Sequence, residues 1–396
     1  MIFWQRRLDG FVARLRDRQV PLRIALWDGA EAVLGDVPRV TFRVPTAASL
    51  RYLINPTLDS LGRAYVEGKL EMEGRLTDVI DVATKLAAST GHRVRRPLRH
   101  FHHTRERDAK AIGYHYDVSN EFYASWLDRN MVYSCGYFRT ADDSLEQAQI
   151  QKIDHILTKL RVRPGDRLLD IGCGWGALIM RAAQAYGATC VGITLSKNQY
   201  ELATERIAAA GLQDRCEVRV EDYRDVVGRF DRVTSVGMFE HVGRRNLRGY
   251  FAKIRDLLND DGAALNHGIT STDPDSAEAP YGGGDFIERY VFPLGELPHI
   301  GLALKEMSAA GLEPVDVENL RRHYVLTLNQ WAERFEAAGE RLRELAGEAR
   351  WRIWRLYLAG CAHGFANDWI SLHQILAVKS GSRKDVLPMT RDYMYR

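Results

Sequence analysis

The chain has 396 residues, of which 45% are hydrophobic and 27% charged, and its formal net charge is only +3. This composition is that of an ordinary globular protein and excludes an intrinsically disordered chain. The small net charge excludes a whole-molecule field that would require an anionic partner. At this length, two domains are expected.

The five cysteines are odd in number and include no C-x-x-C pair. This argues against a disulfide framework and against a structural zinc site, and it favours a reducing compartment. No run of about 18 apolar residues suggests a membrane span. The start of the chain, Met1-Ile2-Phe3-Trp4, lacks the apolar stretch and cleavage site of a secretion signal. We therefore expect a cytosolic protein without a metal site.

Residues 1–20 predict an amphipathic helix. Its apolar residues recur at helical spacing, and arginines occupy much of the remainder. The apolar positions are Trp4, Leu8, Phe11, Val12 and Leu15. Two interpretations are open: the helix lies on an anionic bilayer, or its apolar stripe packs on its own domain.

Residues 1–91 predict a small α+β domain associated with lipid. Short β-rich runs at 22–27 and 40–44 precede helical stretches from about Ala47 and near 76–87. Residues 92–110 are then rich in arginine and histidine, which indicates a basic linker. This linker either touches lipid phosphates or is a solvated connector. Its histidines have no spacing that would predict a metal site.

Residues 111–396 predict the second domain, in which strands alternate with helices. The expected strands are at 167–171, 189–194, 216–220, 229–236 and 263–269. The expected helices are at 177–186, 197–210 and 246–258. This alternation predicts an α/β fold with a Rossmann-like, doubly wound and mostly parallel sheet that carries helices on both faces.

A glycine-rich turn links the first of these strands to a helix. It has the pattern D-x-G-x-G-x-G, formed by Asp170, Gly172, Gly174 and Gly176. Glycines at a strand end let the backbone turn sharply and approach a ligand closely. The pattern is more typical of S-adenosylmethionine-dependent methyltransferases than the G-x-G-x-x-G of dinucleotide-binding proteins. The next strand also ends, at Thr194, without the carboxylate with which a nicotinamide enzyme holds ribose.

The absent carboxylate has to be replaced by another polar group. Methyltransferases usually place an acidic residue after the second strand to bind the ribose hydroxyls, whereas this chain has Thr194, Ser196 and Gln199 there. An amide or a hydroxyl is therefore expected to substitute. Asp222 and Tyr223 follow the third strand, where methyltransferases bind adenine. The neighbouring Glu221 is either part of that site or an exposed loop carboxylate.

Six segments together resemble the cyclopropane-fatty-acid synthase family, which includes mycolic-acid enzymes. They are YHYDVSNEFY (114–123), MVYSCGYF (131–138), LDIGCGWG (169–176), ITLSKNQ (193–199), MFEHVG (238–243) and YVFP (290–293). Their number and order make the resemblance specific, and they cover most of 111–396. The additional N-terminal domain is similar to the bacterial branch that acts on phospholipids. The segment 276–284 departs from the family pattern, close to where acyl chains are expected to enter.

The resemblance implies roles for individual residues. Cofactor contacts are implied for Tyr133, Ser134, Asp170, Gly172, Gly174, Gly176, Thr194, Ser196, Gln199, Asp222 and Tyr223. A bicarbonate ion is implied at Cys135, Glu240, His267, Tyr324 and the backbone of Ile269. The family is also assigned a functional cysteine that matches Cys361, which we interpret as a packing residue near the acyl tunnel. The implied enzyme is a homodimer at the inner, cytoplasmic face of the membrane, with the phospholipid bilayer as its partner.

The implied reaction explains why these residue types are needed. An unactivated alkene is a weak nucleophile, so holding it in line with the sulfonium methyl is the main contribution. Methyl transfer leaves a carbocation, and a bicarbonate oriented by Glu240, His267 and Tyr324 accepts the proton whose loss closes the cyclopropane ring. Four aromatic residues, Tyr133, Tyr137, Phe239 and Tyr290, either stabilise the cation or simply pack in the core.

Three other functions stay open. The same methyl transfer could end in a methyl-branched, methylene-branched or furan-precursor fatty acid. The basic linker could indicate a nucleic-acid methyltransferase, but the chain has neither the [D/N/S]-P-P-[aromatic] loop nor the Pro-Cys nucleophile of those enzymes, so we expect no nucleic-acid partner. The third function is that of a non-catalytic lipid-binding protein that retains only the fold.

Overall fold

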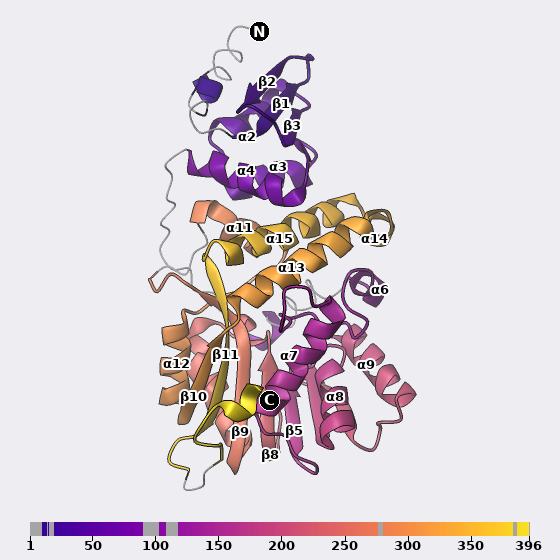
Figure 1. Ribbon diagram of the computed structural model, residues 1–396, viewed down its shortest axis with the longest axis vertical. Helices are drawn as coiled ribbons and strands as arrows, with labels where there is room; N and C mark the ends of the chain where they lie inside the picture. Colours follow the sequence, from indigo (N-terminus) through magenta and orange to yellow (C-terminus); the bar gives the residue numbers. More distant parts are fainter. Residues whose placement is uncertain are drawn as a thin grey trace.

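The computed structural model describes residues 10–13, 15, 20–89, 103–107, 118–275, 280–382 and 386–395. A small sheet near the N-terminus and a larger sheet lie at opposite ends of the molecule, with a layer of helices between them (Figure 1). Of the predicted features, Trp4, Leu8 and residues 114–117 lie outside the described residues.

The N-terminal sheet has four strands in the order β2-β1-β3-β4. They are β1 (Leu22–Leu26), β2 (Glu31–Leu34), β3 (Val40–Val44) and β4 (Glu71–Glu73). The accompanying helices are η1 (Ala47–Leu50), α2 (Arg51–Ile54), α3 (Leu58–Val66) and α4 (Leu76–Ala88). Alternate residues such as Leu22 and Ile24 are buried because successive side chains of a strand point to opposite faces. The predicted α+β architecture is confirmed.

Part of the predicted N-terminal helix packs on its own domain. Residues 10–13 are helical, and Phe11 and Leu15 are almost wholly buried in the same apolar cluster as the N-terminal sheet. These two side chains are therefore committed to the protein core and do not face a bilayer. The basic linker lies largely outside the described residues, but within it Arg105 forms an exposed ion pair with Asp225 at 2.8 Å.

The second sheet has seven strands in the order β10-β11-β9-β8-β5-β6-β7. They are β5 (Arg167–Ile171), β6 (Thr189–Thr194), β7 (Cys216–Val220), β8 (Phe230–Val236), β9 (Leu258–Ser271), β10 (Leu312–Asn319) and β11 (Ile370–Lys379). All neighbours pair in parallel except β11, which is antiparallel to β9 and β10. The predicted mostly parallel, doubly wound sheet is confirmed.

Among the predicted strands, the largest difference in a boundary is at the start of β9. Strand β9 begins at Leu258 and not at Ala263. The sequence did not predict this earlier start because Asp260 and Asp261, which are exposed, interrupt the apolar pattern of the strand. The strand therefore follows the preceding helix without a loop.

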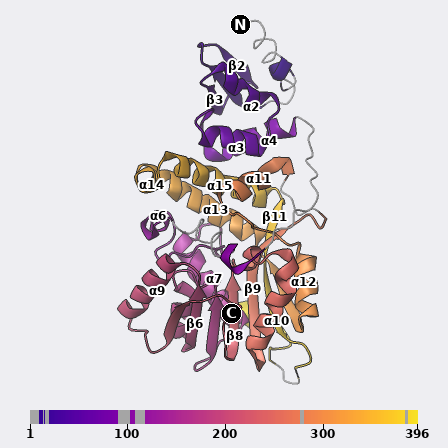
Figure 2. The ribbon, with the colours of Figure 1, turned by 180° about the vertical axis from the view of Figure 1, so that it is seen from behind.

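Helices cover both faces of the larger sheet, as Figures 1 and 2 show from opposite sides. One face carries α7 (Leu145–Lys159), α8 (Ala177–Tyr186) and α9 (Lys197–Ala209), and the other carries α10 (Leu247–Leu257) and α12 (Ile300–Ala309). Above the carboxyl ends of the strands lie α6 (Asn120–Ala124), α11 (Gly283–Tyr290), α13 (Arg321–Ala337), α14 (Gly339–Ala346) and α15 (Glu348–Ala366).

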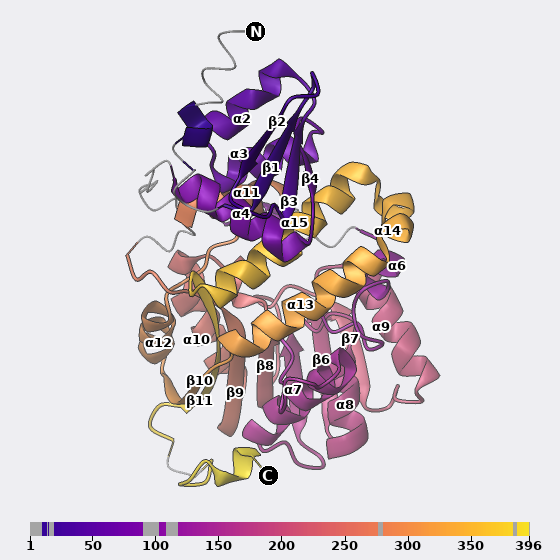
Figure 3. The same ribbon diagram turned by 45° about the horizontal axis from the view of Figure 1, so that its top comes forward.

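Helix α15 joins the two domains. Leu356 and Ala359 of α15, together with Phe286 of α11, belong to the apolar cluster of the N-terminal domain. Arg352 of α15 pairs with Glu71 at 2.9 Å and also donates to the backbone oxygen of Tyr65. Figure 1 shows α15 and α11 directly beneath α3 and α4, and in Figure 3 the N-terminal domain is turned forward over them. The N-terminal core therefore extends onto the larger domain.

Within the described part of the chain, no helix is long and apolar enough to cross a bilayer. No group of three histidine, cysteine or acidic side chains among the described residues could hold a metal ion.

Candidate active site

A pocket of about 140 Å³ opens at the carboxyl ends of β5, β6 and β8, beside the glycine-rich turn. Gly172 has φ +82° and Gly174 has φ +54°, a left-handed conformation that L-side chains rarely adopt. A Cβ atom on Gly172 would lie 3.3 Å from the Cγ atom of Met238. Glycine at these positions therefore permits the left-handed turn and lets the backbone line the pocket without a side chain. Gly176, by contrast, is the N-cap of α8 and does not line the pocket.

The second wall is formed by the start of α9. The hydroxyl of Thr194 donates to Oε1 of Gln199 at 2.7 Å, which fixes the orientation of a buried amide at the pocket. This amide stands where other methyltransferases hold a carboxylate, as expected. Ser196 has a different role: its Oγ accepts from the backbone N–H of Gln199 and caps α9, and it does not line the pocket.

The residues after β7 divide between the pocket and the surface. Glu221 and Tyr223 line the pocket, but Asp222 does not. Both oxygens of Asp222 accept from the side chain of Arg224, at 2.8 and 2.6 Å. Arg224 therefore orients this carboxylate, and a contact between Asp222 and the cofactor stays a prediction.

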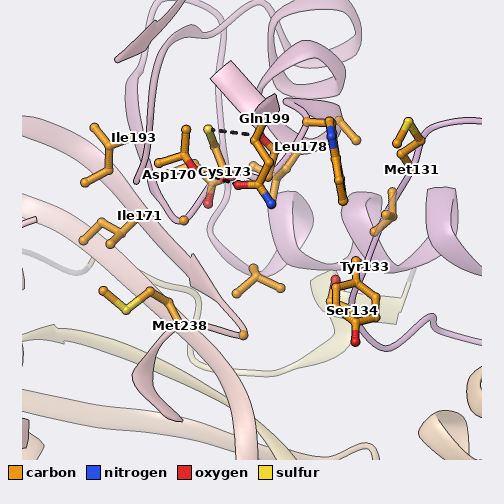
Figure 4. A pocket seen from close by; sticks show the side chains of 18 of the residues that line it. Met131, Tyr133, Ser134, Asp170, Ile171, Cys173, Leu178, Ile193, Gln199 and Met238 are labelled. Atoms are coloured by element: carbon orange, nitrogen blue, oxygen red, sulfur yellow. Dashed lines mark hydrogen bonds between the residues drawn. The ribbon is translucent and has the colours of Figure 1, made fainter. Parts of the chain in front are cut away.

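The third wall comes from the segment before α7. Figure 4 shows Tyr133 and Ser134 on one side of the pocket and Ile171 and Met238 on the other. Nζ of Lys152, on α7, donates to Oγ of Ser134 at 2.8 Å. Thus eight of the eleven predicted cofactor residues line the pocket: Tyr133, Ser134, Asp170, Gly172, Gly174, Thr194, Gln199 and Tyr223.

Lys152 was not predicted from the sequence. It lines the pocket and is only 2% exposed, and its burial lowers its pKa to about 8. The available signal was periodicity: Lys152 occupies a position of α7 that repeats with the buried Leu145, Ala148 and Ile156, where an apolar residue is expected. A lysine at such a position requires a partner, and Ser134 and Asp170 provide polar surroundings.

Asp170, at the end of β5, is nearly fully buried. Its Oδ1 accepts from the hydroxyl of Thr234 at 2.7 Å. Burial raises the pKa of Asp170 to about 6, whereas Thr234 and Lys152 act in the opposite direction. A carboxylate and an ammonium group thus share one wall of the pocket.

Glu240 lies just beyond β8 in the short helix η2 (Phe239–His241). Its Oε1 accepts from the backbone N–H of Ile269 at 2.6 Å, and its Oε2 is buried with no hydrogen-bond partner among the described residues. Burial raises the pKa of Glu240 to about 7. A group with this pKa is readily protonated, and its second oxygen can then donate to an anion.

His267 lies on β9, two residues before Ile269, so the two side chains share one face of the sheet. The side-chain amide of Gln374 donates to Nδ1 of His267 at 3.2 Å, which leaves Nε2 to carry the ring proton. Nε2 is buried and has no partner among the residues described. Burial, reinforced by Lys152 and Lys159, lowers the pKa of His267 well below its usual value, so the imidazole is neutral.

Cys135 and Tyr324 meet at the carbonyl oxygen of Leu320. The thiol of Cys135 lies 3.9 Å from this oxygen, and the backbone N–H of Tyr324 donates to it at 3.1 Å. Burial raises the pKa of the Tyr324 phenol well above its usual value, and an ionised Glu240 acts in the same direction. Tyr324 is therefore a neutral hydrogen-bond donor.

These polar atoms fit an oxyanion. A buried carboxyl oxygen and a buried ring nitrogen without partners are costly to maintain unless a ligand satisfies them. Glu240 also lies between Met238 and His241, both of which line the pocket beside the glycine turn. An anion held by Glu240 would thus be a close neighbour of a cofactor in that pocket.

Residues 103–375 match the family described as mycolic acid cyclopropane synthetase. The chain belongs to this family. Residues 13–94 match a separate domain of unknown function. A solved mycolic acid cyclopropane synthase, in complex with SAH and CTAB, is 34% identical with a TM-score of 0.66, and the match covers 68% of this chain and 98% of that one.

Named relatives extend the comparison. A probable fatty acid methyltransferase of Pseudomonas putida is 49% identical over 96% of this chain and 98% of its own length. The cyclopropane-fatty-acyl-phospholipid synthase of Escherichia coli is 38% identical, but over only 68% of each chain. The protein is an S-adenosylmethionine-dependent methyltransferase, and S-adenosylmethionine is the methyl donor that fits its glycine-lined pocket.

Proposed function

We propose that this methyltransferase transfers a methyl group from S-adenosylmethionine to the double bond of an unsaturated acyl chain in a membrane phospholipid, and that the product is a cyclopropane. Two observations support the proposal: Oε2 of Glu240 and Nε2 of His267 are both buried without partners among the described residues, and Glu240 lies in the chain between Met238 and His241, which line the cofactor pocket. Methyl transfer to an alkene generates a carbocation, and a base at this position is what ring closure requires.

The residues of the chain have three tasks in this reaction. Tyr133, Ser134 and the glycine turn position the donor, so that the alkene and the methyl carbon meet in line. The π electrons of the alkene form the new carbon–carbon bond while the carbon–sulfur bond breaks onto sulfur. Loss of a proton from the transferred methyl group then closes the ring. The aromatic side chains near the pocket exclude water, which would otherwise trap the cation.

Bicarbonate fits the polar atoms beyond the pocket and, when bound, supplies an oxygen base. Protonated Glu240, the neutral imidazole of His267 and the phenol of Tyr324 would donate to it. All three are neutral donors, so they hold an anion without neutralising its basicity through a full countercharge. Cys135 lies beside Tyr324 at the same carbonyl group. We assign no covalent role to its buried thiol, whose pKa burial raises.

A second candidate product is a methyl- or methylene-branched acyl chain. It is favoured by one comparison: a relative that matches across both domains is named a probable fatty acid methyltransferase, whereas the cyclopropane-fatty-acyl-phospholipid synthase of Escherichia coli matches over 68% of the chain. Both products begin with the same transfer: proton loss from the transferred methyl group gives either the ring or a methylene branch. A saturated methyl branch would also require a separate hydride donor.

The test uses purified full-length protein, vesicles of unsaturated phosphatidylethanolamine and phosphatidylglycerol, and methyl-labelled cofactor. Mass spectrometry of the released acyl chains is expected to show one added CH₂ and no remaining double bond. A methylene-branched product would have the same added mass but would retain unsaturation, and absence of labelled lipid would contradict the proposal. Omitting bicarbonate from degassed buffer should slow turnover without weakening cofactor binding.

Further parts of the proposal concern partners and location. We propose that the protein acts as a homodimer at the cytoplasmic face of the membrane. Co-sedimentation with anionic vesicles tests the membrane location, and light scattering tests the homodimer. Protein that stays in the supernatant, or that has the mass of a monomer, would contradict the corresponding point.

A further inference from the structure

A second cavity, of about 120 Å³, lies between the two domains. The N-terminal domain contributes Leu58, Leu61, Gly62, Met72, Val79, Ile80 and Ala83. The larger domain contributes residues from α11, α15 and the start of β11: Gly283, Phe286, Ile287, Leu356, Gly360, Cys361, Gly364, Trp369 and Ile370. Apart from one thiol and one indole, all these side chains are apolar, so the cavity suits a hydrocarbon.

The packing at the wall of the cavity differs between α3, where it is tight, and α15, where there is open space. A Cβ atom on Gly62 would lie 2.7 Å from the ring of Phe286, so at this point α3 and α11 are in close contact. A Cβ atom on Gly360, in the middle of α15, would meet nothing within 4 Å. Gly360 therefore faces the open volume.

The cavity reaches the neighbourhood of the anion site. Cys361 lines the cavity and belongs to the same apolar cluster as Tyr324. Cys361 retains accessible surface even though it lies deep in the protein, because that surface faces the cavity. Tyr324 in turn shares the Leu320 carbonyl oxygen with Cys135. Side chains of one apolar cluster thus connect the wall of the cavity to the proposed anion site.

We propose that the N-terminal domain forms the outer wall of the acyl pocket, and that this cavity binds the methyl-terminal segment of the substrate chain beyond its reacting double bond. This inference rests on the proposed function. It gives a role to a domain whose function is otherwise unassigned: α3, α4 and β4 would determine which chain lengths fit.

The chemistry of the lining decides which end of the substrate is bound. A phospholipid headgroup is polar or charged and would lose its hydration in this cavity without gaining hydrogen bonds. The methyl-terminal segment carries only CH₂ and CH₃ groups, whose transfer from water is favourable. The two walls are also joined by ion pairs, Arg352 with Glu71 and Arg289 with Asp59, so both walls stay together as the chain binds.

The first experiment fills the cavity from the α15 side. Gly360→Leu places a side chain in open space, and leucine is a better helix former than glycine, so the fold should be retained. Oleoyl and palmitoleoyl lipids have the same double-bond position and differ by two methylenes at the methyl end. Each methylene is worth about fourfold in affinity, or about 0.8 kcal/mol, so the wild-type protein should prefer oleoyl by about fifteenfold. Gly360→Leu should abolish or reverse this preference.

The matched control is Gly249→Leu. Gly249 lies on the exposed face of α10, and a Cβ there also meets nothing within 4 Å. This variant should retain the oleoyl preference. If Gly360→Leu has the wild-type ratio of kcat/KM for oleoyl to kcat/KM for palmitoleoyl lipid, the inference is overturned.

The second experiment enlarges the cavity from the N-terminal side. Ile80→Ala removes a wall residue of α4 and should shift the preference by several-fold toward longer chains. Ile24→Ala removes the same atoms from the buried core of the N-terminal sheet, away from the cavity, and should leave the preference unchanged. Equal effects of the two variants would show that the domain acts only through stability, which contradicts the proposed wall.

Binding without turnover separates this inference from the proposed function. Trp369 lines the cavity, so a dibrominated stearic acid bound there should quench part of the tryptophan emission. That part should be lost in Trp369→Phe and in Gly360→Leu, and retained in Gly249→Leu. Quenching with no methylated lipid would overturn the function but support the cavity. Methylated lipid with no Trp369-dependent quenching would overturn the cavity alone.

Discussion

Nζ of Lys152 lies 2.8 Å from Oγ of Ser134, which places a buried ammonium group in the wall of the cofactor pocket. The positive charge acts on two other buried groups: it opposes protonation of Asp170 and of His267. Lys152 is therefore positioned to set the charge state of both the cofactor pocket and the anion site.

We predict that Lys152→Met raises the pKa of Asp170 above its value of about 6 and weakens cofactor binding at neutral pH by about tenfold, since one charge at short range is worth about 1–2 kcal/mol. Calorimetric titration with S-adenosylhomocysteine from pH 5 to 9 should show the binding profile shifted to higher pH. Lys152→Arg should restore most of the profile. If Lys152→Met has the wild-type pH profile, the charge has no such role.

Glu240→Ala should separate catalysis from cofactor binding. The variant removes both the acceptor for the N–H of Ile269 and the donor to the proposed anion, so we expect a loss of activity of about 100-fold or more with unchanged cofactor affinity. Single-turnover assays and calorimetry measure the two quantities. Full activity in this variant would remove Glu240 from the proposed anion site.

Glu240 should also affect stability in a pH-dependent way. Its pKa is about 7 in the folded protein and 4.5 for an ordinary glutamate, so between these values the folded state binds more protons than the unfolded state. Stability should consequently fall as pH rises through this window and then level off, by up to about 3 kcal/mol. Denaturant unfolding of Glu240→Gln should lack this fall, and an identical fall in both proteins would assign it to another group.

Gly172→Ala should impair cofactor binding specifically. Alanine at φ +82° costs about 1–2 kcal/mol, and its Cβ would also press on Met238 at the pocket. Gly165→Ala is the matched control, because Gly165 has φ +87° but its Cβ would meet nothing within 4 Å. Both variants should lose similar stability in thermal melts, and only Gly172→Ala should lose cofactor affinity. Equal affinities would indicate that the turn does not contact the cofactor.

Cys361→Ala distinguishes packing from nucleophilic catalysis. Burial raises the pKa of this thiol to about 12, so almost no thiolate exists at neutral pH. We expect kcat to be retained and the KM for the acyl substrate to rise by a few-fold, because Cys361 lines the apolar cavity. A loss of kcat by orders of magnitude would indicate a covalent role.

The sequence predicted the frame of the cofactor site but not all its members. The turn from Asp170 to Gly176 was recognisable because glycines between an apolar strand and a helix have few other uses. Lys152 was overlooked because a charged residue within a helix normally faces solvent. Its place in the apolar repeat of α7 was the available signal, and the packing of α7 against the sheet shows its burial. The pairing of Asp222 with Arg224 was equally invisible, since it depends on side-chain orientation within a loop.

By itself, the sequence determined the α/β alternation and the glycine turn, because periodicity and motifs are properties of neighbouring residues. The roles of Glu240, His267 and Tyr324 were implied by the family resemblance and stay predictions. Only the tertiary structure decided that Oε2 of Glu240 is left without a partner and that Gly360 faces a cavity closed by the N-terminal domain. The physical reason is that hydrogen-bond satisfaction and empty volume depend on how distant segments pack together, which no local pattern records.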